Sequence, residues 1–123
     1  MTAEPLRLHN LSPVTLRQRL ASSLLALDYG AAVVRVGSDL TGFATDLQRV
    51  YGAFSLVETA FADFHTQVRR GRGVRAYLRP QSRFLIDGIQ PFDPFPREQA
   101  LAHFEWGVNW CFAQRFNQHV LLH

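Results

Sequence analysis

The strongest concentration of chemically useful side chains is an arginine-rich segment over residues 69–83. No acidic residue lies between Asp63 and Asp87. Guanidinium groups bind phosphate and carboxylate oxygens through two parallel hydrogen bonds, so the segment predicts a surface that binds an anionic partner. The alternative is a solvated hairpin whose arginines keep the fold soluble or meet an acidic protein surface. The residues concerned are Arg69, Arg70, Arg72, Arg75, Arg79 and Arg83.

Nucleic acid is a disfavoured ligand for this segment. Tyr77 and Phe84 are interleaved with the arginines and would offer stacking surfaces for bases. The formal net charge of the whole chain is only +3, however, and the basic excess is confined to residues 61–123. A dedicated nucleic-acid binder normally has a stronger positive field. Gly71 and Gly73 indicate a turn and not a phosphate loop, because the Gly-x-x-x-x-Gly-Lys-Ser/Thr pattern is absent from the sequence.

The histidines and the single cysteine do not match a known metal or nucleophile pattern. His119 and His123 are four residues apart, which on a helix would place both on one face. The apolar run there predicts a strand, on which they would lie about 13 Å apart. Neither Cys111 nor His103 completes a zinc-binding spacing. The apolar neighbours of Cys111 predict a buried, unreactive thiol.

Three acidic residues are candidates for a special role. Asp87 and Asp93 flank a glycine and a proline-rich turn, where carboxylates commonly accept bonds from backbone N–H groups. Glu105 stands alone on a nearly all-apolar helix, so we expect it to pair with an arginine or to cap a backbone group. An autonomous enzyme would need a pocket that joins His65, Glu105 or Asp87. Because no pattern selects these groups, we expect no catalytic residue, metal or cofactor in this chain.

Composition narrows the class of protein. With 123 residues, 47% hydrophobic and 19% charged, the chain predicts one domain over residues 1–123 with a real core. All 13 basic residues are arginine, which excludes lysine-based Schiff-base chemistry and the P-loop lysine. One cysteine cannot form an internal disulfide, no apolar run approaches the ~20 residues of a membrane helix, and the start lacks the pattern of a secretory signal. We therefore expect a cytoplasmic protein that does not enter the membrane.

Hydrophobic spacing predicts two helices in the first half of the chain. Ser12 and Pro13 form an N-cap and first-turn pair, leucines then recur at helical spacing, and Gly30 ends the helix. Residues 31–36 are β-branched and apolar, which is typical of a strand. A second helix begins near Ser38.

The second half predicts strands followed by a long apolar helix. The order of all elements predicts an α+β domain with a mostly antiparallel sheet and about three helices. The expected segments are a long or bulged strand over 54–68, a turn over 70–73, a return strand over 74–78, a strand over 83–87 closed by Asp87-Gly88, a helix from 97 to about 117, and a strand over 119–123.

The third helix is expected to be covered by something outside its own sheet. A helix that is apolar almost all round normally lies at the centre of a core or under another domain. Trp106 and Trp110 are therefore candidate domain-interface anchors. The strand predicted at 119–123 stops without a turn or a polar tail, so we expect the chain to end at the boundary of a missing domain. Its open edge predicts homo-oligomerisation.

The motifs around the two tryptophans are the most distinctive part of the sequence. They are Phe92-Asp-Pro-Phe-Pro96, Phe104-Glu-Trp-Gly-Val-Asn-Trp-Cys111 and Val120-Leu-Leu-His123, preceded upstream by Phe61-Ala-Asp-Phe-His65, Tyr77-Leu-Arg-Pro80 and Phe84-Leu-Ile-Asp-Gly88. Together these motifs resemble the N-terminal region of the bacterial HprK-related kinase A family, relatives of HPr kinase/phosphorylase. The resemblance runs from about residue 31 to the end of the chain.

The resemblance implies a role without catalysis. In that family a Walker-type phosphate loop follows this region, so no catalytic or nucleotide-binding residue of the family has a counterpart here. The chain would then be an N-terminal accessory domain that packs on the ATP-binding core of a serine kinase and positions a substrate or partner protein. ATP and magnesium are expected only in the missing kinase domain. The alternative is a free-standing adaptor that binds an acidic protein or nucleic acid through residues 69–83.

Overall fold

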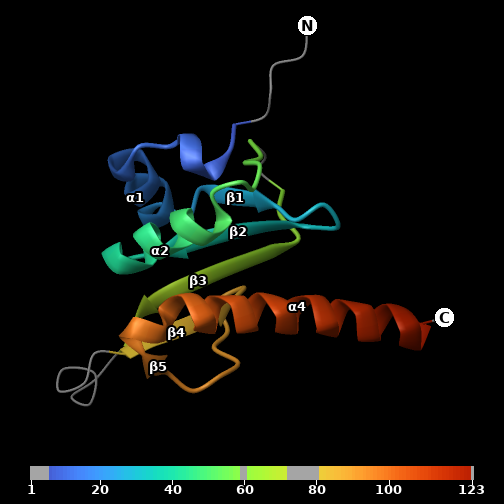
Figure 1. Cartoon of the computed structure of the whole chain (residues 1–123). Coiled ribbons are helices and arrows are strands. Elements are labelled where there is room, and N and C mark those ends of the chain that lie inside the picture. The colour runs from blue at the N-terminus through green and yellow to red at the C-terminus, as the bar shows by residue number, and fades with distance from the viewer. Residues whose placement is uncertain (1–5, 59–60, 72–80, 123) are drawn as a thin grey trace, which may run out of the picture.

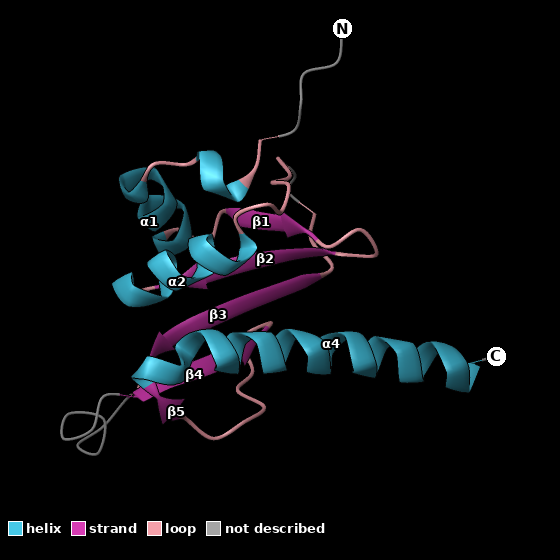
Figure 2. Cartoon of the chain, in the orientation of Figure 1, coloured by secondary structure: helices cyan, strands magenta, loops and turns pink. Residues whose placement is uncertain are grey.

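The computed structural model describes residues 6–58, 61–71 and 81–122. Within these segments the chain forms a five-stranded sheet and three α-helices (Figure 1, Figure 2), which confirms the predicted α+β architecture. The elements in chain order are the 3-10 helix η1 (Leu8–Asn10), α1 (Pro13–Ala21), β1 (Leu25–Asp28), β2 (Val33–Ser38), α2 (Thr41–Tyr51), β3 (Phe64–Arg70), β4 (Gln81–Ile86), β5 (Phe95–Pro96), the 3-10 helix η2 (Arg97–Gln99) and α4 (Ala100–Leu122).

The sheet is mostly antiparallel, as predicted. Its strands lie in the order β1-β2-β3-β4-β5, and only β2 and β3 run parallel among the described strands. Because parallel neighbours need a crossover, α2 connects β2 to β3 as the helix of a βαβ unit. The carboxyl ends of β2 and β3 therefore meet at one edge of the sheet, next to the start of α2.

The core lies on one face of the sheet. Val34 pairs with Phe64 and Val68 with Phe84, and all four side chains are buried. The helices pack on this face: the Phe64 ring lies 5.6 Å from the Phe112 ring of α4, and α4 in turn contacts α2. Alternate residues of the strands, including His65, point to the opposite face.

The first helix is shorter than its leucine spacing predicts. Ser12 caps it as expected, since its Oγ accepts from the Thr15 N–H at 3.2 Å. The helix ends at Ala21, because Ser23 adopts a left-handed φ of 56° and reverses the chain. Of the leucines that continue the helical spacing, Leu27 lies in β1 and Leu24 in the link before it. Gly30, predicted as the helix cap, lies in the turn between β1 and β2 with a φ of 84°.

The predicted long strand over 54–68 is two separate segments. Leu56 forms an isolated bridge with Leu27 of β1, and the Val57 N–H donates to the Ala26 carbonyl at 3.0 Å. Only from Phe64 onward does the chain enter the sheet as β3. The prediction was wrong because parallel pairing with β2 requires the chain to pass outside β1 before it returns.

The Asp87-Gly88 turn closes β4 as predicted. Both residues have positive φ, 50° and 83°, which suits a tight two-residue turn. Ile86 and Ile89 exchange backbone hydrogen bonds across it at 2.8 and 2.9 Å. The strand begins at Gln81, two residues earlier than expected. The return strand predicted at 74–78 lies outside the described residues.

The end of the chain is helical where a strand was predicted. Helix α4 runs through Leu122, so residues 119–122 continue the helix and do not form a strand. No proline or glycine follows Gly107, so nothing in the sequence terminates the helix once it has formed. The open strand edge that predicted homo-oligomerisation is therefore absent from residues 119–122. No helix in the described segments combines the length and apolarity that crossing a membrane requires.

Candidate functional site

Three of the predicted arginines lie at the end of the β3–β4 ladder, with Arg69 and Arg83 on one face of the sheet and Arg70 on the other. Arg69 lies directly opposite Arg83, and Arg70 opposite Ser82. The Arg83 Nε donates to the Arg70 carbonyl at 2.8 Å, and the Arg69 Nε donates to Gln67 Oε1 at 3.2 Å. Like charges directly opposite each other destabilise a sheet. Arg72, Arg75 and Arg79 lie outside the described residues.

The neighbouring edge of the sheet carries charges of both signs. The Arg70 N–H donates to Asp39 Oδ1 at 3.1 Å, which ties the end of β3 to the residue that follows β2. A hollow of about 380 Å³ opens beside this contact, between α2, β3 and η2. Arg70 and Arg97 line it, but so do Asp46 and Glu98. The edge is therefore a mixed polar surface and not a purely cationic one.

A second candidate surface is a stack of aromatic rings on the first half of α4, which we call the aromatic platform: Phe92, Phe95 and Trp106. The Trp106 ring lies 4.6 Å from the Phe92 ring and 5.7 Å from the Phe95 ring, in both cases nearly parallel to it. The proline-rich segment before α4 brings the two phenylalanines onto the helix. Trp106 remains 52% exposed. The platform is thus a large, rigid apolar surface that faces solvent.

Trp110 extends the aromatic platform toward the core. Its ring meets the Phe92 ring edge-on at 5.6 Å, and the residue is half-buried. Of the two predicted interface anchors, Trp106 presents its side chain outward, whereas Trp110 supports the rings beneath. The roles of Phe92 and Phe95 were not predicted. Their repeated spacing with proline, Pro91-Phe92 and Pro94-Phe95, was the available signal, since proline removes the segment from regular structure and leaves its rings to pack on a neighbour.

His103 lies beneath the aromatic platform without a polar partner. The residue is 0% exposed, and its ring centre is 4.0 Å from that of Phe95. Neither ring nitrogen has a hydrogen-bond partner among the described residues. Burial lowers the pKa of His103 below its ordinary value. His103 is therefore a neutral packing residue that favours the folded state only while it stays unprotonated.

Glu105 lies near two tyrosines and contributes to the rise in their pKa values. It forms no ion pair within the described part of the chain. Burial raises the pKa of Tyr51 to about 12, and the nearby Glu105 carboxylate adds to this shift. Burial also raises the pKa of Tyr29, and the neighbouring Tyr51 hydroxyl adds to this shift. Both phenols therefore stay neutral near pH 7, and neither is an activated nucleophile.

The other candidate groups do not form one pocket. Cys111 is buried, and burial raises the pKa of its thiol to about 12, which confirms the prediction of an unreactive thiol. The Asp87 carboxylate accepts from the His65 N–H at 3.3 Å, so it supports the start of β3. The His65 side chain lies on the face of the sheet opposite the core. Glu105 lies on the core side, where it contributes to the raised pKa of Tyr51. Among the described residues, the His65 and Glu105 side chains therefore lie on different faces of the sheet.

Comparison with known proteins does not identify a family for this chain. No protein family, curated protein or solved structure matches the chain. Within residues 6–58, 61–71 and 81–122, no three histidine, cysteine or acidic side chains lie close enough to hold a metal ion. The resemblance to the HprK-related kinase A family therefore stays a prediction from sequence motifs.

Proposed function

We propose that this chain is a non-catalytic accessory domain that binds a partner protein through the aromatic platform, and that the partner is the ATP-binding core of an HprK-related serine kinase. The observation that carries the proposal is the half-exposed Trp106 ring stacked on Phe92 and Phe95. Tryptophan is enriched among the residues that dominate binding energy at protein interfaces. A rigid aromatic stack also binds at low entropic cost, because its side chains are already ordered.

Two further features support an interaction role over catalysis. The aromatic platform lies on α4, the helix that leads toward the kinase core in the proposed arrangement. Two side chains that could take part in catalysis have structural roles. The Cys111 thiol is buried, and the Asp87 carboxylate accepts a hydrogen bond from a backbone N–H. The kinase would supply ATP and magnesium binding, and this domain would supply contacts to the core or to its substrate. We place the domain in the bacterial cytoplasm, where a lone buried cysteine is ordinary.

The first test is the size of the native product. An antibody raised against this chain should detect a host protein much larger than 14.0 kDa, and peptide sequencing of that product should reveal a Walker-type phosphate loop. A product at 14.0 kDa with no larger species would refute the kinase assignment and leave a free-standing binding domain.

The second test locates the contact surface. A photoreactive benzoylphenylalanine at position 106 should cross-link to peptides of the kinase core in the host. The matched control places the same group at Val14, which is 55% exposed on α1 and lies away from the aromatic platform (Figure 1). Equal cross-linking from both positions would contradict docking through the platform.

The alternative is an adaptor that binds an acidic protein through the arginine segment 69–83. The register that places Arg69 against Arg83 favours it, because an anionic partner would offset their repulsion. Reversing Arg70, Arg72 and Arg75 to glutamate should then abolish partner binding, whereas Trp106→Ser should leave it intact. The opposite pattern would exclude the adaptor. Binding that falls steeply with added salt, with a nucleic acid as the ligand, would point to phosphate contacts instead.

A further inference from the structure

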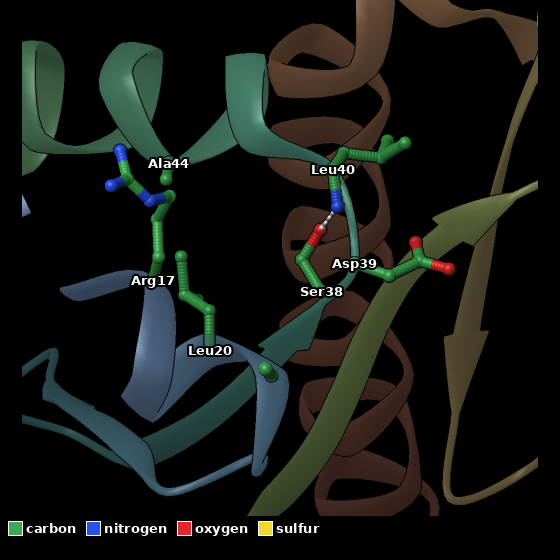
Figure 3. A pocket seen from close by; sticks show the side chains of 7 residues that line it. Arg17, Leu20, Ser38, Asp39, Leu40 and Ala44 are labelled. Carbon is green, nitrogen blue, oxygen red and sulfur yellow. Dashed lines mark hydrogen bonds between the residues drawn. The ribbon is translucent and has the colours of Figure 1, made fainter. Parts of the chain in front are cut away.

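A small cavity lies between α1 and the connection from β2 to α2, on the far side of that connection from the Arg70–Arg97 hollow. Its volume is about 160 Å³, and Figure 3 shows the side chains that line it. Leu20 and Ala21 close it from α1, and Leu40 and Ala44 from the start of α2. An enclosed cavity of about 150 Å³ lined by large apolar side chains accepts a benzene ring. The present pocket has a similar volume but is open to solvent on one side, and polar side chains also line it. The space therefore suits one aromatic ring or one branched aliphatic group.

Two polar groups of the cavity have unused hydrogen-bonding capacity. Ser38 is 3% exposed, and its Oγ accepts from the Leu40 N–H at 3.0 Å. The Ser38 hydroxyl hydrogen has no acceptor among the described residues, so it remains available as a donor. Arg17 forms no ion pair or hydrogen bond within residues 6–58, 61–71 and 81–122, and Figure 3 shows its guanidinium beside Ala44. Burying a hydroxyl without an acceptor costs free energy.

The one carboxylate in the lining is turned away. Asp39 Oδ1 accepts from the Arg70 N–H at 3.1 Å, and Figure 3 shows its carboxylate directed toward β3 and away from Leu20 and Arg17. The Arg17 side is therefore cationic, and the walls are apolar. An apolar body with a negatively charged oxygen at one end complements both.

We infer that this cavity is a binding site for a small monocarboxylate with an aromatic or branched apolar body. The ring or branched group fills the space between Leu20 and Ala44. The carboxylate lies at the rim beside the Arg17 guanidinium, which supplies the positive charge and lies on the other side of Leu20 from Ser38 in Figure 3. The site is independent of the aromatic platform and of the proposed kinase partner.

The test uses the full chain and three probes of graded chemistry: benzoate, its neutral isostere benzamide, and acetate, which lacks the ring. Amide shifts of Ser38, Leu40 and Ala44 should saturate with benzoate below about 10 mM, and benzamide should bind more weakly. Acetate should produce no saturable shift, because it leaves the apolar space unfilled.

Two variants test the charged rim and the apolar interior of the site separately. Arg17→Gln should weaken benzoate binding by about fivefold and leave benzamide within about twofold, since it removes only an exposed charge. Ala44→Leu should fill the cavity and abolish binding of both, with the melting temperature confirming that the variant folds. Arg49→Gln is the matched control, because this arginine lies on α2, pairs with Asp46 and does not line the cavity.

Each contrary outcome overturns the inference. Absence of saturable shifts would mean that the cavity is a packing void. Benzamide binding as tightly as benzoate, or an unchanged benzoate affinity in Arg17→Gln, would refute a carboxylate ligand. Benzoate binding that survives Ala44→Leu would place the ligand elsewhere on the protein.

Discussion

Gly107 marks the closest approach of α4 to the sheet, and replacing it by alanine tests the packing directly. A Cβ at this position would lie 2.5 Å from two ring carbons of Phe84 and 2.7 Å from a third. Phe84 is 0% exposed, so its ring has no free space into which to retreat. Either α4 must lift from β4 or the ring must leave its preferred rotamer.

The magnitude follows from two opposing effects. Ordinary contact between carbons needs about 3.5 Å or more, so α4 and Phe84 must separate by about 1 Å, which places the overpacking cost near the upper end of the usual range, about 3 kcal/mol. Alanine in a helix interior is favoured over glycine by about 1 kcal/mol. The net expectation for Gly107→Ala is a loss of about 2 kcal/mol in the free energy of unfolding. For a chain of this size that lowers the melting temperature by about 8 °C.

The assay is thermal and urea unfolding followed by circular dichroism, with Gly42→Ala as the matched control. Gly42 is also helical, but a Cβ there would meet nothing within 4 Å. Gly42→Ala should therefore raise stability by about 0.5 kcal/mol. The double variant Gly107→Ala with Phe84→Leu should show a favourable coupling energy of about 1 kcal/mol. A Gly107→Ala protein as stable as the wild type, or no coupling to position 84, would refute this packing.

Three further changes test other parts of the fold. Burial lowers the pKa of His103 below 6.5. Its contribution to stability is therefore complete above about pH 6.5 and is lost as the pH falls, because the unfolded chain takes up the proton. Urea unfolding at about pH 5.5 and 7.5 should show a weaker pH dependence of stability in His103→Phe than in the wild type, and an equal dependence would contradict this role. Because burial raises the pKa of Cys111 to about 12, Ellman's reagent at about pH 8 should label the thiol far more slowly in the folded chain than in urea, and equal rates would show that the thiol is accessible. Gly88→Ala should lower the free energy of unfolding by about 1 kcal/mol, since Gly88 has a φ of 83°, and an unchanged melting temperature would exclude strain at that turn.

The features that could be predicted depend on residues close together in the chain. Ser12 caps α1 through an N–H three residues away, and the Asp87-Gly88 turn needs only its own backbone angles. The α+β class and the mostly antiparallel sheet follow from the order of such local signals. The buried state of Cys111 follows from its apolar neighbours on α4. The arginine segment could be read directly from the sequence. The role of Trp106 as an interface anchor stays a prediction, and the structure shows only that the residue is 52% exposed.

The features that were mispredicted depend on partners far along the chain. Leu27 keeps the helical spacing of the first helix, yet it lies in β1, where β2 provides the hydrogen-bonding neighbour. Residues 119–122 are apolar enough for a strand, but they continue a helix already stabilised by its packing on β3 and β4.

The candidate sites divide in the same way. The residue order alone shows which side chains are available, such as a run of arginines and two tryptophans. Their neighbours come from the three-dimensional packing. It places Arg69 opposite Arg83, stacks Phe92 and Phe95 on Trp106, and forms an open pocket between α1 and α2 whose lining residues are as far apart in the chain as Arg17 and Ala44. Strand register and helix packing minimise the free energy of the whole chain, so no short stretch of sequence contains those contacts.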